Sequence, residues 1–458
     1  MAWRPLAFFA FLAPPGSAKL ALPTDHPLPK VSVIIPAYNE AENIAHCLLS
    51  LHAQTYPHRL LEVIVVDDGS DDATVDIVMR YMGNAQPRHR YLQTNSFIVP
   101  VRAFGGTLAI IQRERNGDSG KPSAFNAGLA VATGEIIVAV DADVVLAPDA
   151  IEQAIAAFLA DDVLIAATGH LIIDSRLVVE FDANGDICLD ESGLPIPRRL
   201  SLSERILTAS QFLEYVASFH LGRRSESTVD GMFTISGACA AFRATVFEEA
   251  RQQYRKRTVT EDADLTMTLH RLKDFRIGYL PTMRVHLTPV LSWTQLYGQR
   301  FRWQRGALEV SAIHHLRRRD PQQKWYLWNV MLPLYLRVNH TLIFPRLAWS
   351  LVLFLLPLFG YSWGLVWQLV YFLYLLYLVL NTGRTLVAYL MSSIPEKIYI
   401  RKYLPYLALY PLYRSFLFWV TLSADIRTLS EKAQWTVESP LLSRLERSAR
   451  LGGRRLTS

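Results

Sequence analysis

Acidic residues recur at short spacings along the chain, close to apolar runs. Residues 67–69 read Asp-Asp-Gly, residues 141–143 read Asp-Ala-Asp, and residues 260–262 read Thr-Glu-Asp. Asp141 and Asp143 lie two residues apart just past an apolar run, so both carboxylates can face one divalent cation. Mg²⁺ and Mn²⁺ prefer such oxygen ligands. In isolation, two acidic loop residues that cap the next helix explain the same spacing, so the pair needs its sequence context.

A fourth run, residues 299–303 (Gln-Arg-Phe-Arg-Trp), follows the three acidic motifs. Each motif alone is weak, because short acidic strings are common on solvated loops. The four in this order, followed by apolar segments of membrane-spanning length, resemble the signature of the processive family-2 inverting glycosyltransferases. That group contains the cellulose, chitin, hyaluronan and poly-N-acetylglucosamine synthases. The resemblance covers residues 30–310 by motif and the remainder by hydropathy.

Length and composition indicate several structural units and a membrane surface. The 458 residues exceed what one core usually holds, and 51% are hydrophobic. The formal net charge of +6 is too small to indicate nucleic acid. Many basic residues lie near apolar segments, which suits an anionic lipid surface. The three cysteines form no C-x-x-C pair and the twelve histidines show no ligand spacing, so neither predicts a metal site.

Alternating apolar runs and helical patterns predict an α/β fold. Three short β-branched runs are typical of buried parallel strands: residues 31–36, 61–66 and 136–140. Helices are predicted over residues 40–51 and 71–81, with Ser70 as N-cap of the second. This order predicts a doubly wound sheet with ligands at the carboxyl ends of its strands. The resemblance implies a GT-A (nucleotide-diphospho-sugar transferase) fold with a doubly wound mixed sheet, followed by C-terminal transmembrane helices.

The loops after the first two predicted strands carry candidate donor-binding residues. Pro36, Tyr38 and Glu40 follow the first strand, and Tyr38 can cover the face of a base. Asp67 and Asp68 follow the second strand, where a carboxylate can accept a hydrogen bond from a uracil N–H or a ribose hydroxyl. The resemblance assigns uridine binding to these positions.

Residues 120–126 resemble the family's glycine–lysine step before a helix, with Pro122 as a departure that suits a first helical turn. Lys121 would approach the nucleotide as a point charge, and a solvated lysine explains it equally well. With the other motifs present, Asp143 and Asp141 are predicted to bind Mg²⁺ or Mn²⁺ and tie it to the diphosphate. Asp141 also counts among the donor-binding residues.

Asp262 is predicted to be the catalytic base, because it ends a run that resembles the family's T-E-D motif. An inverting transfer needs one carboxylate to take the acceptor proton, and a second carboxylate nearby can raise its pKa toward neutrality. Glu261 and Asp264 also suit the acidic start of a helix without any catalytic role. Gly237, within residues 236–239, resembles part of the acceptor floor, where small residues allow a sugar to approach closely.

The residues of the motif at 299–303 are candidates for binding the diphosphate and the acceptor sugar. On a helix, Gln299, Arg302 and Trp303 fall on one side. Arg302 can contact the diphosphate, and Trp303 offers a flat face for an acceptor sugar. Gln299 can hydrogen-bond the sugar or the Trp region. An amphipathic membrane-surface helix is a compatible alternative. Three upstream residues are assigned to the acceptor wall: Gln211, Glu214 and Tyr215.

The segments predicted along the chain are an N-terminal interfacial segment (1–29), the GT-A domain (30–290), the Q-x-x-R-W motif with interfacial helices (291–340), transmembrane helices (341–425) and a basic tail (426–458). Candidate spans cover residues 342–361, 365–379 and 404–422, and residues 325–336 form a further span or an interfacial helix. The basic tail favours a cytoplasmic end and therefore two or four crossings.

The resulting hypothesis is a multi-pass enzyme of the cell membrane with a cytoplasmic catalytic domain. It would use a UDP-sugar, with UDP-N-acetylglucosamine leading by resemblance, and Mg²⁺ or Mn²⁺ to extend a β-linked polysaccharide. Its expected partners are the UDP-sugar donor, the growing glycan, the lipid bilayer and accessory membrane or export subunits, without nucleic acid. The alternatives are a single transfer to a lipid-linked or short glycan, and a non-catalytic membrane scaffold. The sugar, the linkage, the polymer length and the number of spans stay open.

Overall fold

The structure is a computed structural model that describes residues 20–22, 27–82, 89–90, 97–98, 106–114, 120–182, 188, 196–228, 230–249, 258–270, 275–315 and 343–428. The chain forms two compact units. The sheet unit comprises residues 1–198, 221–257 and 261–288, and the helical unit comprises residues 199–220, 258–260 and 289–458.

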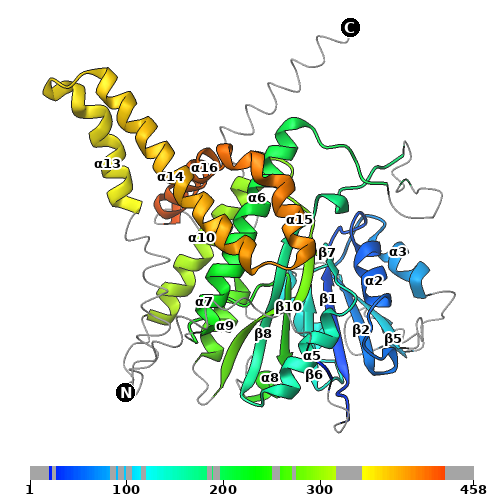
Figure 1. Ribbon diagram of the computed structural model, residues 1–458. Coiled ribbons are helices and arrows are strands. Elements are labelled where there is room, and N and C mark those ends of the chain that lie inside the picture. Colours follow the sequence, from blue (N-terminus) through cyan, green and yellow to red (C-terminus); the bar gives the residue numbers. More distant parts are fainter. Residues whose placement is uncertain are drawn as a thin grey trace, which may run out of the picture. The chain divides into compact units, whose positions relative to one another are not determined.

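An eight-stranded mixed sheet forms the centre of the sheet unit, in the order β5-β2-β1-β6-β9-β8-β10-β7 (Figure 1). The strands are β1 (Val31–Ala37), β2 (Leu61–Asp67), β5 (Thr107–Gln112), β6 (Ile136–Val140), β7 (Val144–Leu146), β8 (Leu164–Ile173), β9 (Cys239–Arg243) and β10 (Arg276–Leu287). β1 runs parallel to β2 and β6, and β2 runs parallel to β5. β9 is antiparallel to β6 and β8, and β7 is antiparallel to β10. The predicted mixed sheet is confirmed.

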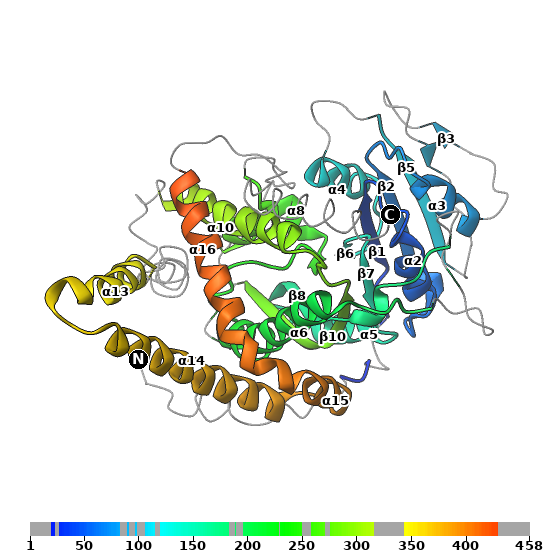
Figure 2. The same cartoon turned by 90° about the horizontal axis from the view of Figure 1, so that it is seen from above.

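Helices cover both faces of this sheet. They are α2 (Ile44–His52), α3 (Thr74–Met82), α4 (Lys121–Leu129), α5 (Ala150–Ala160), α7 (Arg224–Thr228), α8 (Thr245–Glu249) and α9 (Glu261–Leu269). Figure 2 shows α2 and α3 on one face and α4 on the other. Short elements complete the unit: the 3₁₀ turns η1 (His58–Leu60) and η2 (Ser175–Leu177), and the two-stranded β3 (His89–Arg90) and β4 (Phe97–Ile98). The arrangement is doubly wound, as predicted.

The strand order places a topological switch point beside β1. From β1 the chain builds outward through β2 and β5, and then returns to place β6 on the other side of β1. Ligands of doubly wound folds bind in the crevice outside the carboxyl ends of the strands at such a point. The loops that follow β1, β2 and β6 therefore meet at one edge of the sheet.

The strands at the switch point are buried on both faces, because helices cover each side. β2 and β6 are buried along their whole length, and β1 is buried at every residue except half-buried Pro36. Gly128 of α4 lets this helix approach closely, since an added Cβ would lie 2.5 Å from Cγ2 of Ile34 and 3.1 Å from Cγ2 of Val66. The backbone of α4 thus rests directly on β1 and β2.

The helical unit contains α6 (Leu202–Ala217), α10 (Trp293–His315), α13 (Ile343–Leu355), α14 (Trp363–Met391), α15 (Ile394–Tyr403) and α16 (Tyr410–Thr428), with the 3₁₀ turns η5 (Leu356–Phe359) and η6 (Leu404–Leu409). The π-helical turn η3 (Ser218–Arg223) follows α6. α13 and α14 form a hairpin (Figure 1). Among the described residues, α14 is the one helix with the length and composition of a membrane span, with a mean hydropathy of 1.8 over its most apolar stretch.

The other predicted spans differ from α14. Residues 342–361 cover α13, of 13 residues, and the 3₁₀ turn η5. Residues 404–422 divide between η6 and α16. Prolines at the start of both 3₁₀ turns break these segments, so a set of several spanning helices stays a prediction. Residues 325–336, residues 1–19 of the N-terminal segment and residues 429–458 of the tail lie outside the described residues.

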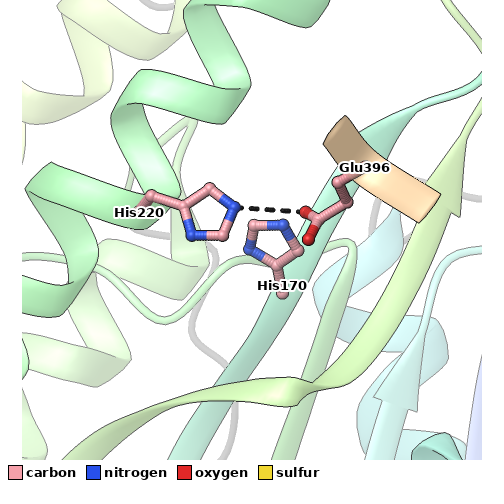
Figure 3. A group of neighbouring side chains, drawn as sticks. All are labelled: His170, His220 and Glu396. Carbon is pink, nitrogen blue, oxygen red and sulfur yellow. Dashed lines mark hydrogen bonds and ion pairs between the residues drawn. The ribbon is translucent and has the colours of Figure 1, made fainter. Parts of the chain in front are cut away.

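A buried polar contact joins two parts of the helical unit. The Nε2 atom of His220 lies 3.2 Å from Oε1 of Glu396 (Figure 3). The hydroxyl of Ser392 lies 3.1 Å from the same nitrogen. Glu396 also closes the capping box of α15, accepting the backbone N–H of Ser393 at 2.9 Å. One carboxylate therefore caps a helix and ties its start to the turn that follows α6.

Because Gly128 has no room for a side chain, Gly128→Ala should lower the free energy of unfolding by about 1–3 kcal/mol, the usual cost of overpacking. Gly383→Ala is a matched control, since Gly383 is also inside a helix but an added Cβ there meets nothing within 4 Å. Thermal unfolding of both purified variants in detergent measures the difference. Equal midpoints for the two variants would contradict the close packing of α4.

Candidate active site

Hydrogen bonds clamp the loops after β1 and β2 to each other. The backbone N–H of Asn39 donates to Oγ of Ser70 at 3.0 Å, and the N–H of Asp71 donates to Oδ1 of Asn39 at 3.0 Å. Asn39 adopts a left-handed φ of 56°, which a short amide side chain tolerates. The prediction that Ser70 caps a helix was wrong, because its hydroxyl is used in this clamp and α3 begins only at Thr74.

Asp68 links the end of β2 to the start of α4. Its Oδ1 accepts a hydrogen bond from Nη1 of Arg113 at 2.9 Å, and its Oδ2 accepts the backbone N–H of Gly120 at 2.5 Å. Nη2 of Arg113 donates in turn to Oγ of Ser123 at 2.8 Å. This buried network fixes the first turn of α4, and therefore the position of Lys121.

A continuous chain of contacts leads from β6 to α9. The Nζ atom of Lys121 lies 2.5 Å from Oδ1 of Asp141 and donates to the carbonyl oxygen of Gly237 at 3.0 Å. The N–H of Gly237 donates to Oδ2 of Asp262 at 3.0 Å. A pocket lies at this point, lined by Pro36, Lys121, Phe125, Ala139, Val140, Asp141 and Gly237. The topology thus connects Lys121, which lines this pocket at the switch point, through Gly237 to Asp262, 141 positions after Lys121 in the chain.

Three carboxylates act on one another at the loops after β1 and β6. Burial, together with the charges of Asp143, Asp141 and Asp72, raises the pKa of Glu40 to about 7, against a hydrogen bond from Asn43 that lowers it. Burial and the charge of Asp141 raise the pKa of Asp143 to about 6, while Lys121 lowers it. Carboxylates that repel one another in a partly buried site favour a neutralising cation, so this donor set fits a hard divalent ion.

Lys121 and the start of α9 form a second charged group. Burial lowers the pKa of Lys121, but nearby carboxylates, above all that of Asp141, raise it well above its usual range. Burial and the neighbouring charge of Asp262 raise the pKa of Glu261 to about 7, although Lys121 lowers it. Burial also raises the pKa of Asp262, against the effect of Lys121. Lys121 therefore stays a fixed positive charge among carboxylates that protonate more easily than usual.

The Q-x-x-R-W residues lie on α10 in the helical unit. Trp303 is exposed at 43%, Arg302 is half-buried, and Oε1 of half-buried Gln299 has no hydrogen-bond partner among the described residues. Arg300 is buried, and its guanidinium carbon lies 4.1 Å from the centroid of the Trp303 ring. Its Nη2 donates to Oε2 of Glu214 at 2.8 Å. One face of the Trp303 indole is therefore covered by a cation.

Gln211, predicted to join the acceptor wall, has the geometry of a structural clamp. Its Nε2 donates to the carbonyl oxygens of Val290 at 2.7 Å and Leu207 at 3.2 Å, and its Oε1 accepts the N–H of Val290 at 3.1 Å. The side chain is 1% exposed. Gln211 thus fastens α6 to the segment that precedes α10.

Two family profiles match most of the chain between them. The profile of glycosyl transferase family 2 matches residues 32–251, and that of glycosyl transferase family group 2 matches residues 202–421. The chain belongs to glycosyltransferase family 2. The family predicted from the order of the four motifs is confirmed, and both matched regions are glycosyltransferase domains.

Two curated relatives agree with this assignment, and one solved structure shares the fold. A poly-β-1,6-N-acetyl-D-glucosamine synthase of Staphylococcus epidermidis is 25% identical over 66% of this chain and 61% of its own length. An N-acetylglucosaminyltransferase of Mesorhizobium japonicum is 27% identical over 64% of this chain and 59% of its own length. The chain thus spans about three fifths of these relatives. A Pyrobaculum calidifontis mannosyltransferase, solved with GDP-Man and Mn²⁺, shares the fold at 19% identity and a TM-score of 0.51, covering 93% of this chain and 95% of that one.

Sequence reasoning missed two arginines of this glycosyltransferase. Arg113 comes directly after β5, at the same carboxyl edge as Asp68, but the strand before it was not predicted. Had residues 107–112 been assigned as a strand, the same edge rule would have pointed to Arg113. Arg300 was noticed only as part of a motif, and no local signal shows that its partner Glu214 lies 86 residues earlier.

Gly237→Ala tests the contact chain directly. An added Cβ would lie 3.1 Å from Nζ of Lys121 and 3.2 Å from Oδ2 of Asp262, so both groups must shift by a few tenths of an ångström. Turnover should fall by about tenfold, because small displacements of reacting groups are costly, while the unfolding midpoint stays near that of wild type. Steady-state assays with a thermal-shift control measure both. Wild-type turnover in the folded variant would show that this contact chain is not part of the catalytic geometry.

Proposed function

We propose that the enzyme is a membrane-bound inverting glycosyltransferase that transfers N-acetylglucosamine from UDP-N-acetylglucosamine to a growing β-linked glycan. The observation that carries this proposal is the contact chain from Asp141 through Lys121 and Gly237 to Asp262 at the switch point. It would join a candidate diphosphate site at the pocket to a candidate base that contacts Gly237 of the pocket lining. The names of the two curated relatives support the donor sugar and the polymeric product.

The donor would lie across the carboxyl ends of β1, β2 and β6. Tyr38, which is 40% exposed, would cover the uracil ring, and Pro36 would line the pocket beneath it. The carboxylate of Asp67 would accept from the uridine, while Asp68 would act mainly by holding the start of α4. Lys121 would place its fixed charge beside the diphosphate.

Asp143 and Asp141 would hold Mg²⁺ or Mn²⁺, with Glu40 close to them. The raised pKa values of Glu40, about 7, and of Asp143, about 6, support a cation site, because each reflects uncompensated negative charge as well as burial. When bound, the cation would neutralise the negative charge that develops on the departing diphosphate.

Asp262 would take the proton of the acceptor hydroxyl. Its Oδ2 accepts the N–H of Gly237 at 3.0 Å and its Oδ1 accepts the N–H of Ala263 at 2.8 Å, so the carboxylate is held in one orientation. Burial raises its pKa, which makes it a better base than an ordinary aspartate once it is ionised. Lys121 lowers the same pKa and so opposes the effect of burial.

The motif on α10 would serve the acceptor and the leaving group. The exposed Trp303 would support the acceptor sugar, and Arg302 would contact the diphosphate. Gln299 would offer its amide oxygen, which has no hydrogen-bond partner within the described part of the chain, to a sugar hydroxyl. The apolar, mostly exposed α14 would cross the cell membrane, with the catalytic domain in the cytoplasm. Further crossings, the predicted domain boundaries and accessory export subunits belong to the same proposal.

Asp262→Asn should leave UDP affinity unchanged and reduce transfer by about a hundredfold or more, the scale of losing a general base. Asp162→Asn is a matched control, because that carboxylate is fully exposed. Purified enzyme, UDP-N-acetylglucosamine and a UDP-release assay measure the rates, and calorimetry measures the affinity. Near-normal turnover of the folded Asp262→Asn enzyme would remove Asp262 from the role of base.

Asp143→Ala should abolish Mn²⁺-dependent activity and also the Mn²⁺-dependent part of UDP binding, because the cation would tie this carboxylate to the diphosphate. Calorimetry of UDP binding with Mn²⁺ or with EDTA measures the dependence for wild type and variant. If wild type binds UDP equally well with and without EDTA, the metal proposal is wrong. If the Asp143→Ala variant keeps the full Mn²⁺-dependent UDP binding of wild type, Asp143 is not a ligand.

Trp303→Ala should impair glycan extension far more than hydrolysis of the donor by water, since water needs no sugar platform. Arg302→Ala should reduce both, because stabilising the leaving group serves either acceptor. UDP release and product length on a gel are measured in parallel. Full-length polymer at the normal rate from Trp303→Ala would leave Trp303 as an interfacial anchor. A wild-type enzyme that adds only one sugar to every acceptor offered would support single transfer in place of processive synthesis.

A further inference from the structure

Three helices of the helical unit meet at one carboxylate oxygen. Oε2 of Glu214, on α6, accepts Nη2 of Arg300 at 2.8 Å and the hydroxyl of Tyr413 at 2.6 Å. Arg300 comes from α10 and Tyr413 from α16. The carboxylate therefore fixes the guanidinium group relative to two other helices.

Arg300, held in this way, contacts the ring of Trp303. Its guanidinium carbon lies 4.1 Å from the centroid of the Trp303 ring and 5.7 Å from that of Tyr215. Arg300 is 8% exposed, whereas Trp303, one helical turn later, is 43% exposed. A planar guanidinium over one face of an indole restricts the rotation of the ring, while the residue as a whole stays exposed.

Stability alone does not explain this arrangement. Nε and Nη1 of Arg300 have no hydrogen-bond partner among the described residues, although both atoms are buried. Buried unsatisfied donors destabilise a fold, and a buried ion pair is often matched or exceeded in stability by apolar residues of similar size. A lysine would keep the charge but would lose the flat stacking surface.

We propose that Glu214, Arg300 and Tyr413 are positioning residues that orient the Trp303 indole for the acceptor sugar. The inference rests on the proposed role of Trp303 as acceptor platform. The three residues act through Trp303 and do not themselves touch the reacting atoms. Their loss should therefore weaken binding of the acceptor without changing the chemistry at the donor.

The test separates the Michaelis constant for the acceptor from turnover. With UDP-N-acetylglucosamine as donor and a β-linked N-acetylglucosamine tetrasaccharide as acceptor, Glu214→Gln should raise the acceptor KM by about tenfold. The donor KM and the rate of donor hydrolysis by water should stay within about twofold of wild type. Arg300→Lys should behave like Glu214→Gln, because it cannot restore the stack.

Asp425→Asn is the matched control. Asp425 on α16 accepts Nε2 of Gln304 on α10 at 2.7 Å, so this change also weakens a carboxylate contact between the same two helices but leaves Arg300 untouched. It should leave the acceptor KM near that of wild type. Tyr413→Phe removes one neutral hydrogen-bond donor to Glu214 and should raise the acceptor KM by about threefold. This second variant still tests the proposal if Glu214→Gln does not fold.

A double-mutant cycle distinguishes positioning from independent effects. In a Trp303→Ala background, Glu214→Gln should change the acceptor KM no further, because its effect is transmitted through Trp303. Equal increases in both backgrounds, or an equal increase in Asp425→Asn, would overturn the inference. If Trp303→Ala alone leaves the acceptor KM unchanged, the platform role fails and this inference fails with it. If Trp303→Ala raises the acceptor KM but Glu214→Gln and Tyr413→Phe do not, this inference alone is wrong.

Discussion

The ammonium group of Lys121 is the positive charge on which the carboxylates of the sheet unit depend. It lies 2.5 Å from the carboxylate of Asp141, and it lowers the pKa of Asp143, Glu261 and Asp262 while burial raises them. Without it, these partly buried acids would share one edge of the sheet with less compensation, and their pKa values would be raised further. The position of this one group therefore limits how far burial raises the pKa of these three carboxyl groups.

Three levels of structure fix that position. The parallel pairing of β1 with β2 and β6 creates the switch point. Gly128 lets α4 rest directly on the strands, which sets the depth of the helix, and Asp68 holds the backbone of Gly120 just before it. Lys121 is the first residue of α4. In doubly wound sheets, helices begin at the carboxyl edge of the strands, so the ammonium group of Lys121 lies beside the carboxylates at that edge.

The parts that sequence reasoning predicted are those encoded locally. Buried parallel strands appear as unbroken apolar runs, and the chemistry follows directly after them, so the edge of the sheet and its acids could be placed. The capping role of Ser70 could not be judged, because its hydroxyl accepts from Asn39, 31 residues earlier. Arg300 binds the carboxylate of Glu214, which lies 86 residues before it in the sequence. The same carboxylate binds Tyr413, which lies 199 residues after Glu214. Contacts between helices of this kind leave no periodic signal.

The two arginines of the motif on α10 show what burial adds to a sequence pattern. Arg300 and Arg302 have the same chemistry and lie two residues apart, so helical geometry points them in nearly opposite directions. Arg300 turns inward to Glu214 and stacks under Trp303, while Arg302 stays half-buried. A guanidinium that is already bound to a carboxylate and covered by an indole is poorly placed to follow a departing diphosphate. In the proposed function, Arg302 is therefore the arginine of the motif that would serve the leaving group, while Arg300 would hold the aromatic ring beside it.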